Sequence, residues 1–263
     1  MGTWHSFLAI GDSFTEGMND ADGAGGYRGW ADRVAEQLAA RSPGLRYANV
    51  AVRGRLLAGI VNDQVPVAER LRPDLITFAA GGNDILRPGC DVDRLADLAR
   101  GAIGRLAATG AEVVVFTGFD PRGVLLIGRL RGLIAAYNEL LRDAANQHGC
   151  RIVDLWAMRV LQDRRAWSED RLHLTTEGHE RVAMHVAEVL GLPVTADWRE
   201  PWPADPPLPW PDARREDLRW ARQYLLPWLR ERARDRALRR PGGAGQLAKR
   251  PELAPFLDSA AEA

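Results

Sequence analysis

Two segments of this sequence carry side chains that could move a proton away from a nucleophile. Ser13 stands in a Gly-Asp-Ser turn, where its hydroxyl could attack a carbonyl carbon if a base removed its proton. Asp170 precedes His173 by three residues, a spacing at which a carboxylate can bond the imidazole Nδ1 and fix the tautomer. Together these residue types could form a nucleophile, a base and an orienting acid.

Two further segments could stabilise negative charge on a reacting oxygen. Gly54 follows an apolar run, and a glycine lets its amide approach a ligand closely. Asn83 lies in a Gly-Gly-Asn-Asp turn and offers a side-chain N–H. With the amide of Ser13, these groups could form an oxyanion hole.

Each segment also has a purely structural interpretation. Ser13 followed by Glu16 is a capping box for a helix start. An Asp-x-x-His pair is usually a surface pair, and the residues around Gly54 and Asn83 are typical of turns. The catalytic interpretation gains weight because all four segments are expected at the same edge of one sheet.

The elements that would position these residues alternate along the chain. Five short apolar runs, at 7–10, 47–52, 75–80, 113–117 and 152–155, predict strands buried on both faces. Apolar residues at steps of three and four predict helices between and after them: Trp30, Val34 and Leu38; Leu95, Leu98, Ala102 and Leu106; Ile134, Tyr137, Leu141 and Ala145; Val182, Val186 and Val189.

This alternation predicts an α/β fold, a three-layer α/β/α sandwich around a five-stranded parallel sheet of flavodoxin-like type. In such sheets ligands bind beyond the carboxyl ends of the strands. Ser13, Gly54 and Asn83 each follow a predicted strand, and His173 lies shortly before the last predicted helix of the sandwich. The fold therefore predicts that the four segments meet.

The four segments resemble, in order and spacing, those of the SGNH, or GDSL-type, hydrolases. The resemblance covers residues 7 to about 190 and implies a serine esterase that needs no cofactor. It implies Ser13 as nucleophile, His173 as base and Asp170 as its orienter. The implied oxyanion hole consists of the Ser13 and Gly54 amides and the Asn83 side chain. The Gly-x-Ser-x-Gly elbow of α/β-hydrolases is absent around Ser13.

Composition changes after residue 193, which predicts a catalytic domain over 1–193 and an extension over 194–263. The extension begins with a strap in which prolines alternate with Trp198, Trp202 and Trp210. A basic amphipathic helix is expected from an Asp212 cap to Arg240, with Leu218, Ala221, Leu225 and Leu229 on one face and a kink at Pro227. Residues 213–250 hold 12 basic and 4 acidic side chains, and the segment from 241 onward is expected to be loosely ordered.

Three functions follow from these features. The leading one is hydrolysis of small-molecule esters with small or medium acyl groups. The second is transfer of the acyl group to a sugar or other hydroxyl acceptor, with the strap tryptophans covering the site. The third, of another class, is binding of a membrane or partner through the basic helix at 212–240. The formal net charge of zero gives no reason to expect a nucleic acid.

Other side chains are expected to be structural. His179 and His185 follow His173 at steps of six, which is no one-face helical spacing, so we expect no metal site. Asp12 and Asp84 are expected to order loops. The two cysteines are too few for a disulfide scaffold, and no signal peptide or membrane span is recognisable, so we expect a cytoplasmic protein. Acyl-chain length would depend on a pocket shaped by Phe14, Met18, Leu86 and Leu125.

Overall fold

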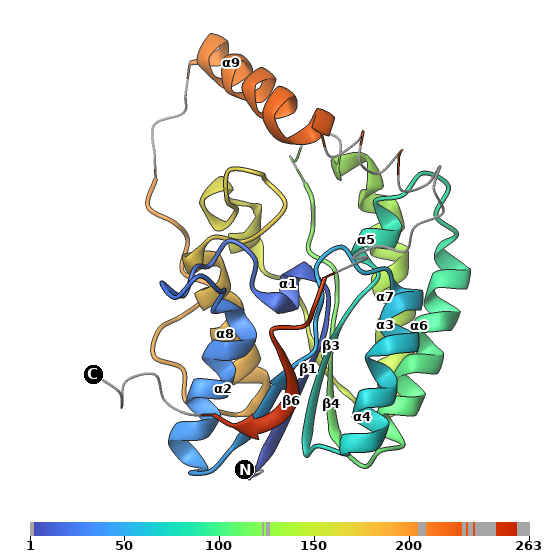
Figure 1. The fold of residues 1–263 in the computed structure, drawn as a ribbon. Coiled ribbons are helices and arrows are strands. Elements are labelled where there is room, and N and C mark those ends of the chain that lie inside the picture. Colours follow the sequence, from blue (N-terminus) through green and yellow to red (C-terminus); the bar gives the residue numbers. More distant parts are fainter. Residues whose placement is uncertain are drawn as a thin grey trace.

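Short strands and longer helices alternate along the chain and form a sheet with helices on both faces (Figure 1). The computed structural model describes residues 3–122, 124, 127–204, 209–227, 230, 234 and 246–256. Its strands are β1 (Ser6–Gly11), β2 (Arg46–Asn49), β3 (Leu75–Ala79), β4 (Glu112–Phe116), β5 (Arg151–Val153) and β6 (Arg250–Pro255). The main helices are α2 (Gly29–Arg41), α3 (Leu57–Asp63), α4 (Val65–Leu71), α6 (Val92–Ala107), α7 (Arg131–Gln147), α8 (Thr176–Leu190) and α9 (Trp210–Trp220). Two single turns, α1 (Ser13–Glu16) and α5 (Gly82–Ile85), follow β1 and β3.

The strand order is β5-β4-β3-β1-β2-β6. The first five strands are parallel and run in the flavodoxin-like order, which confirms the predicted α/β sandwich. The predicted count of five is wrong by one, because β6 adds a sixth strand antiparallel to β2. The carboxyl ends of β1 and β3, which carry α1 and α5, are adjacent in the sheet.

The apolar strands lack alternation because both faces of the sheet are buried. In β1, Phe7 and Ala9 pack into the core beneath α2 and α8, whereas Leu8 and Ile10 pack into the core beneath α3, α4, α6 and α7. Figure 1 shows these two helical layers on opposite sides of the sheet. Each strand residue therefore has an apolar partner whichever way it points.

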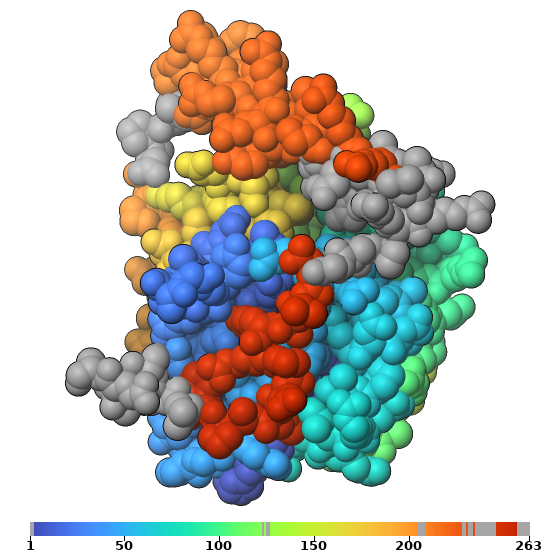
Figure 2. Space-filling model, viewed as in Figure 1, coloured from blue at the N-terminus to red at the C-terminus, as the bar shows by residue number. Residues whose placement is uncertain are grey.

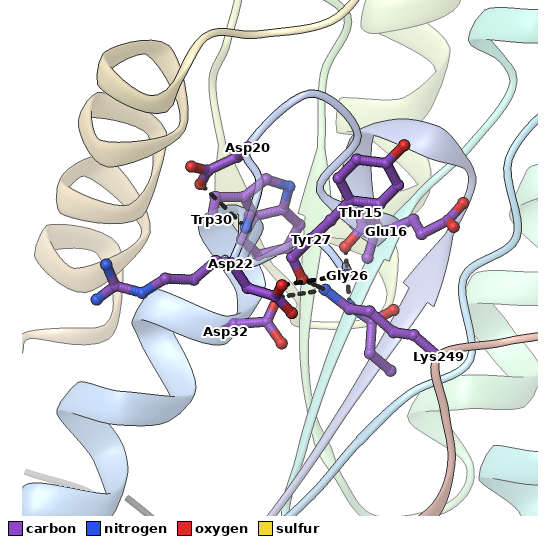
Figure 3. Close-up of polar contacts among 12 residues, drawn as sticks. Thr15, Glu16, Asp20, Asp22, Gly26, Tyr27, Trp30, Asp32 and Lys249 are labelled. Atoms are coloured by element: carbon purple, nitrogen blue, oxygen red, sulfur yellow. Dashed lines mark hydrogen bonds and ion pairs between the residues drawn. The ribbon is translucent and has the colours of Figure 1, made fainter. Parts of the chain in front are cut away.

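The C-terminal segment returns to the edge of the sheet and is attached there. Residues 250–255, expected to be loosely ordered, form β6, whose two prolines are compatible with an edge strand. Just before β6, the Lys249 ammonium donates hydrogen bonds to the Tyr27 carbonyl oxygen at 2.9 Å and to the Asp32 carboxylate (Figure 3). Lys249 thus ties the end of the chain to the loop that precedes α2.

The strap is bound to the body of the protein by its tryptophans. The indole N–H of Trp198 donates to Glu188 of α8 at 2.9 Å, and Trp198 is buried. The indole N–H of Trp202 donates to the Val160 carbonyl oxygen, in the 3-10 turn η2 (Arg159–Gln162), at 3.0 Å. Both side chains therefore anchor the strap, and neither lines the cavity beside Ser13.

Helix α9 differs from its prediction at its start. It begins at Trp210, after a Pro209 cap without a side-chain bond, and Asp212 pairs with Arg215 instead. A π-helical turn, η4 (Ala221–Leu225), follows it, and most of the predicted continuation to Arg240, Leu229 included, lies outside the described residues. Figure 2 shows α9, in orange, lying over the yellow part of the chain.

Within the described ranges, no helix is both long and apolar enough to span a membrane.

The bond between Lys249 and Asp32 can be tested with Lys249→Met, which keeps the length of the side chain and removes its charge. At pH 8 we expect the free energy of unfolding to fall by about 1–3 kcal/mol, because the buried Asp32 carboxylate loses its cation. Burial raises the pKa of Asp32 to about 6, so the folded state binds this proton more tightly than the unfolded chain does. The carboxyl is therefore mostly neutral at pH 5, and the loss should be smaller there.

Urea denaturation at pH 5 and pH 8 measures this difference. The double variant Asp32→Asn with Lys249→Met leaves no unpaired charge and should recover most of the loss at pH 8. An equal loss for Lys249→Met at both pH values would contradict the ion pair as its cause.

Candidate active site

Ser13 lies at the carboxyl end of β1, as the first residue of the turn α1. Asp12 is the helix cap, since its side chain accepts a hydrogen bond from the Phe14 amide at 3.1 Å. Glu16 does not complete a capping box, because its carboxylate accepts from the Arg53 amide at 2.8 Å and pairs with the Arg53 guanidinium. The capping-box interpretation therefore does not describe this turn, and the Ser13 hydroxyl has another partner.

That partner is the imidazole of His173, from the loop before α8. The Ser13 Oγ lies 3.0 Å from the His173 Nε2, although the two residues are 160 positions apart. On the other side of the ring, the His173 Nδ1 lies 2.7 Å from the Asp170 Oδ2. The structure thus brings together the three residues that the sequence suggested, in one line of hydrogen bonds. Such a line can take a proton from a serine hydroxyl and hold the resulting imidazolium.

The Asp170 carboxylate accepts hydrogen bonds from more than His173. Its Oδ1 accepts from the Ser168 hydroxyl at 2.7 Å and from the amides of Leu172 and His173 at 2.9 and 3.0 Å. Its Oδ2 also accepts from the Asn19 side chain at 2.9 Å. Burial opposes ionisation here, but the bond and charge of His173 with the backbone donors outweigh it and hold the pKa of Asp170 well below its usual range.

Asn19 and Ser168 are site residues that the sequence reasoning missed. Asn19 has a φ of 69°, and its side-chain nitrogen also donates to the Ser168 hydroxyl at 2.8 Å. Asparagine is one of the few residues that adopt this left-handed backbone readily, so its residue type indicates a turn at position 19. Nothing else in the sequence connects Asn19 with Asp170. The contact joins the loop that follows Ser13 to the loop that carries His173.

Asn83 lies beside Ser13 and is buried. Its side-chain nitrogen donates to the Asp12 Oδ2 at 2.9 Å and to the Arg55 carbonyl oxygen at 3.1 Å. Gly54, the residue before Arg55, has a φ of 73°, a conformation that favours glycine. The loops after β2 and β3 therefore meet next to the β1 end that carries Ser13.

Two carboxyl groups near Ser13 order the loops around it. Asp12 is buried, and that burial raises its pKa to about 6 despite the bonds from Phe14 and Asn83. The Asp84 Oδ2 accepts from the Leu57 amide at 2.9 Å and so fixes the start of α3.

His179 and His185 each contact other parts of the protein. The His179 Nδ1 accepts from the Trp30 amide and its Nε2 donates to the Met18 carbonyl oxygen, both at 3.2 Å, so the ring is neutral. Burial lowers the pKa of His179 to about 4. The ring of His185 instead packs against Trp198 in a tilted arrangement, with centroids 4.3 Å apart. Through its bonds with Met18 and Trp30, His179 holds the loop after α1 against α2.

A cavity of about 160 Å³ opens beside Ser13, Asn83 and His173. Its wall is mostly apolar and draws on the hydrophobic cores of both sides of the sheet and on the loop that carries His173: Phe14, Met18, Ala79, Ala80, Ile85, Leu86, Phe116, Phe119, Ile127, Ile134, Tyr137, Leu155, Leu161, Trp167, Leu172 and Leu174. Three residues of the predicted pocket, Phe14, Met18 and Leu86, line it, and the fourth, Leu125, lies outside the described residues. An apolar group attached to a reacting carbonyl would fit there.

Known structures share this fold. LAE5, an alpha/beta hydrolase enzyme from the metagenome of Lake Arreo, Spain, aligns with a TM-score of 0.62 and 22% identity over 73% of this chain and 97% of its own. Axe2, an acetylxylan esterase from Geobacillus stearothermophilus, aligns with a TM-score of 0.61 and 20% identity over 76% and 98%. TesA aligns with a TM-score of 0.60 and 22% identity over 70% and 97%.

A comparison with curated proteins gave no match. A comparison with family profiles does identify the family. The profile of the GDSL-like Lipase/Acylhydrolase family matches residues 9–181, more than half of the chain, and this range contains every site residue described above. The chain therefore belongs to the GDSL-like lipase/acylhydrolase family of ester hydrolases.

Proposed function

We propose that this protein hydrolyses carboxylic esters with Ser13 as nucleophile, His173 as general base and acid, and Asp170 as the group that orients His173. The observation that carries the proposal is the unbroken line of contacts, 3.0 Å from the Ser13 Oγ to the His173 Nε2 and 2.7 Å from Nδ1 to Asp170. Hydrogen-bond reach between nucleophile, base and orienter is the geometric requirement for this chemistry.

The reaction proceeds in two halves. The Ser13 oxygen attacks the ester carbonyl carbon while its proton passes to the His173 Nε2, and the imidazolium then protonates the leaving alcohol as the C–O bond breaks. In the second half, a water molecule loses its proton to His173 and attacks the acyl-enzyme. Collapse of that intermediate releases the carboxylic acid and returns the proton to Ser13. The ionised Asp170 stabilises the imidazolium in both halves.

The negative charge on the carbonyl oxygen would be held by the amides of Ser13 and Gly54 and by the Asn83 side chain. Asn83 is already oriented, because its two side-chain hydrogens point to Asp12 and to the Arg55 carbonyl oxygen. The oxyanion would compete with the Asp12 carboxyl for one of them. Because its pKa is raised, the Asp12 carboxyl takes up a proton more readily than an exposed aspartate does, which lowers the cost of bringing a second negative charge close.

The cavity supports an acyl group larger than acetyl. Its volume of about 160 Å³ is close to that of a cavity that holds benzene, about 150 Å³, so roughly six carbon atoms fit. We therefore propose butyryl to hexanoyl esters, or esters of an aromatic acid, as substrates. Acetyl groups, the acyl groups of the acetylxylan named for Axe2, would leave much of the cavity empty.

The two other functions have less support. Acyl transfer needs a cover over the site, and the strap tryptophans Trp198 and Trp202 are engaged with α8 and η2 instead. Among the described basic residues that suggested a membrane or partner site, Arg214, Arg215 and Lys249 pair with acidic side chains of the chain itself. We therefore retain hydrolysis as the proposal.

Ser13→Ala tests the nucleophile. We expect the turnover of p-nitrophenyl butyrate to fall by about 10⁴-fold or more, because among the described residues only the Ser13 hydroxyl bonds the His173 Nε2. Ser42→Ala, at the far end of α2, is the matched control and should keep full activity. Turnover within tenfold of wild type in a folded Ser13→Ala variant would refute the assignment.

Asn83→Ala tests the oxyanion hole. Loss of one donor should lower kcat by about 10²- to 10³-fold while KM changes little, since the charge develops only in the transition state. Asn146→Ala, on the exposed face of α7, serves as the control. A rise in KM with unchanged kcat would instead assign Asn83 to substrate binding.

Leu86→Trp tests the acyl cavity, which Leu86 lines. The larger ring should fill much of the space, so kcat/KM for p-nitrophenyl hexanoate should fall at least about tenfold relative to the acetate. Leu98→Trp, on the exposed side of α6, should leave the ratio unchanged. An unaltered hexanoate-to-acetate ratio in Leu86→Trp would place the acyl chain elsewhere.

A further inference from the structure

The loop that carries the acid and the base, residues 168–173, is in contact with the C-terminal extension. The Trp220 indole N–H, at the end of α9, donates to the Asp170 carbonyl oxygen at 2.9 Å. The Arg171 guanidinium donates to the Asp217 Oδ1 at 2.6 Å and lies over the Trp220 ring, 4.9 Å from its centroid. We call residues 168–173 the acid–base loop and α9 with η4 the C-terminal helix.

A third contact extends the pairing by one residue. The Tyr224 hydroxyl, in η4, donates to the Glu169 carboxylate at 2.9 Å. Asp217, Trp220 and Tyr224 are three and four residues apart, which is the spacing of one helix face. In this order they bind three consecutive residues of the acid–base loop, from Arg171 back to Glu169. The helix therefore follows the loop along its length.

The acid–base loop contains a backbone conformation that needs support. Arg171 has a φ of 57°, in the left-handed region that arginine seldom adopts. It lies between Asp170 and His173, and its conformation brings the amides of Leu172 and His173 onto the Asp170 Oδ1. Because Asp217 and Trp220 hold the Arg171 side chain, they oppose the relaxation of this residue.

The C-terminal helix is not held by burial. None of its described residues is buried, and Leu218 of the predicted apolar face is 59% exposed. The polar contacts with the acid–base loop are therefore a main determinant of where the helix lies. The helix also lies beyond residue 181, where the family match ends, so that match does not include this contact.

The geometry points to a positioning role for this contact. Trp220 and Asp217 of the C-terminal helix hold the acid–base loop and thereby position Asp170 and His173. This inference rests on the proposed triad. The described residues of the helix do not line the cavity, so the helix touches the acid–base loop and not the acyl group. Its loss should therefore slow proton transfer and leave substrate binding largely intact.

Trp220→Phe is the decisive variant, because it removes the N–H donor and keeps a ring beneath Arg171. We expect kcat for p-nitrophenyl butyrate to fall about 10- to 100-fold, as for other small displacements of catalytic groups, with KM within about twofold. Asp217→Asn should act in the same direction. Trp210→Phe and Asp212→Asn, on the same helix but without contact to the loop, are matched controls that should retain wild-type kcat.

Exchanging the charges of Asp217 and Arg171 distinguishes a positioning role from a general loss of structure. Asp217→Arg should lower kcat by repelling Arg171, and Arg171→Asp should lower it by losing the pair, although aspartate tolerates the left-handed backbone. The double variant restores opposite charges and should recover part of kcat. Urea midpoints of all variants should stay close to that of wild type.

The outcomes distinguish this inference from the proposed function. If Trp220→Phe and Trp210→Phe have the same kcat, or if the change falls on KM alone, the positioning role is wrong and the triad stands. If wild-type turnover survives Ser13→Ala, the proposed function fails and the positioning role fails with it. A loss of kcat in Trp220→Phe together with partial recovery in the charge exchange supports both.

Discussion

The arrangement of this site depends on one ionised carboxylate. Asp170 accepts five hydrogen bonds, which come from Asn19, Ser168, Leu172 and, twice, His173. A half-buried charge is tolerated only where its lone pairs are satisfied, so each donor is required to stay in place. Because Asn19 belongs to the loop that follows Ser13, the same charge also fixes the distance between that loop and His173.

The features that the sequence predicts well are those set by local pattern. The five parallel strands follow from short apolar runs, and their order makes the ends of β1 and β3 neighbours. Ser13, Asn83 and His173 could be placed at that edge because each lies next to a predicted strand or helix. The cavity residues Phe14, Met18 and Leu86 were accessible to the same reasoning, since they immediately follow the Ser13 and Asn83 segments.

The features that the sequence did not predict are those set by contacts between distant segments. Strand β6 has exposed side chains and two prolines, and its place depends on backbone pairing with β2, which leaves no apolar pattern. Asn19 meets Asp170 across 151 residues. In α9 the apolar positions predicted a docked face, but polar side chains make the contact, because the opposing surface is a polar loop and not a core.

The C-terminal extension is attached on both sides of α9, by Trp198 and Trp202 before it and by Lys249 and β6 after it. A segment anchored at both ends explores little volume, so the helix meets the acid–base loop at a high effective concentration. Exposed polar contacts that would be too weak for two separate molecules can then stay formed. The C-terminal helix acts as a tethered ligand of the acid–base loop. The fraction of molecules in which this contact is formed is therefore independent of protein concentration.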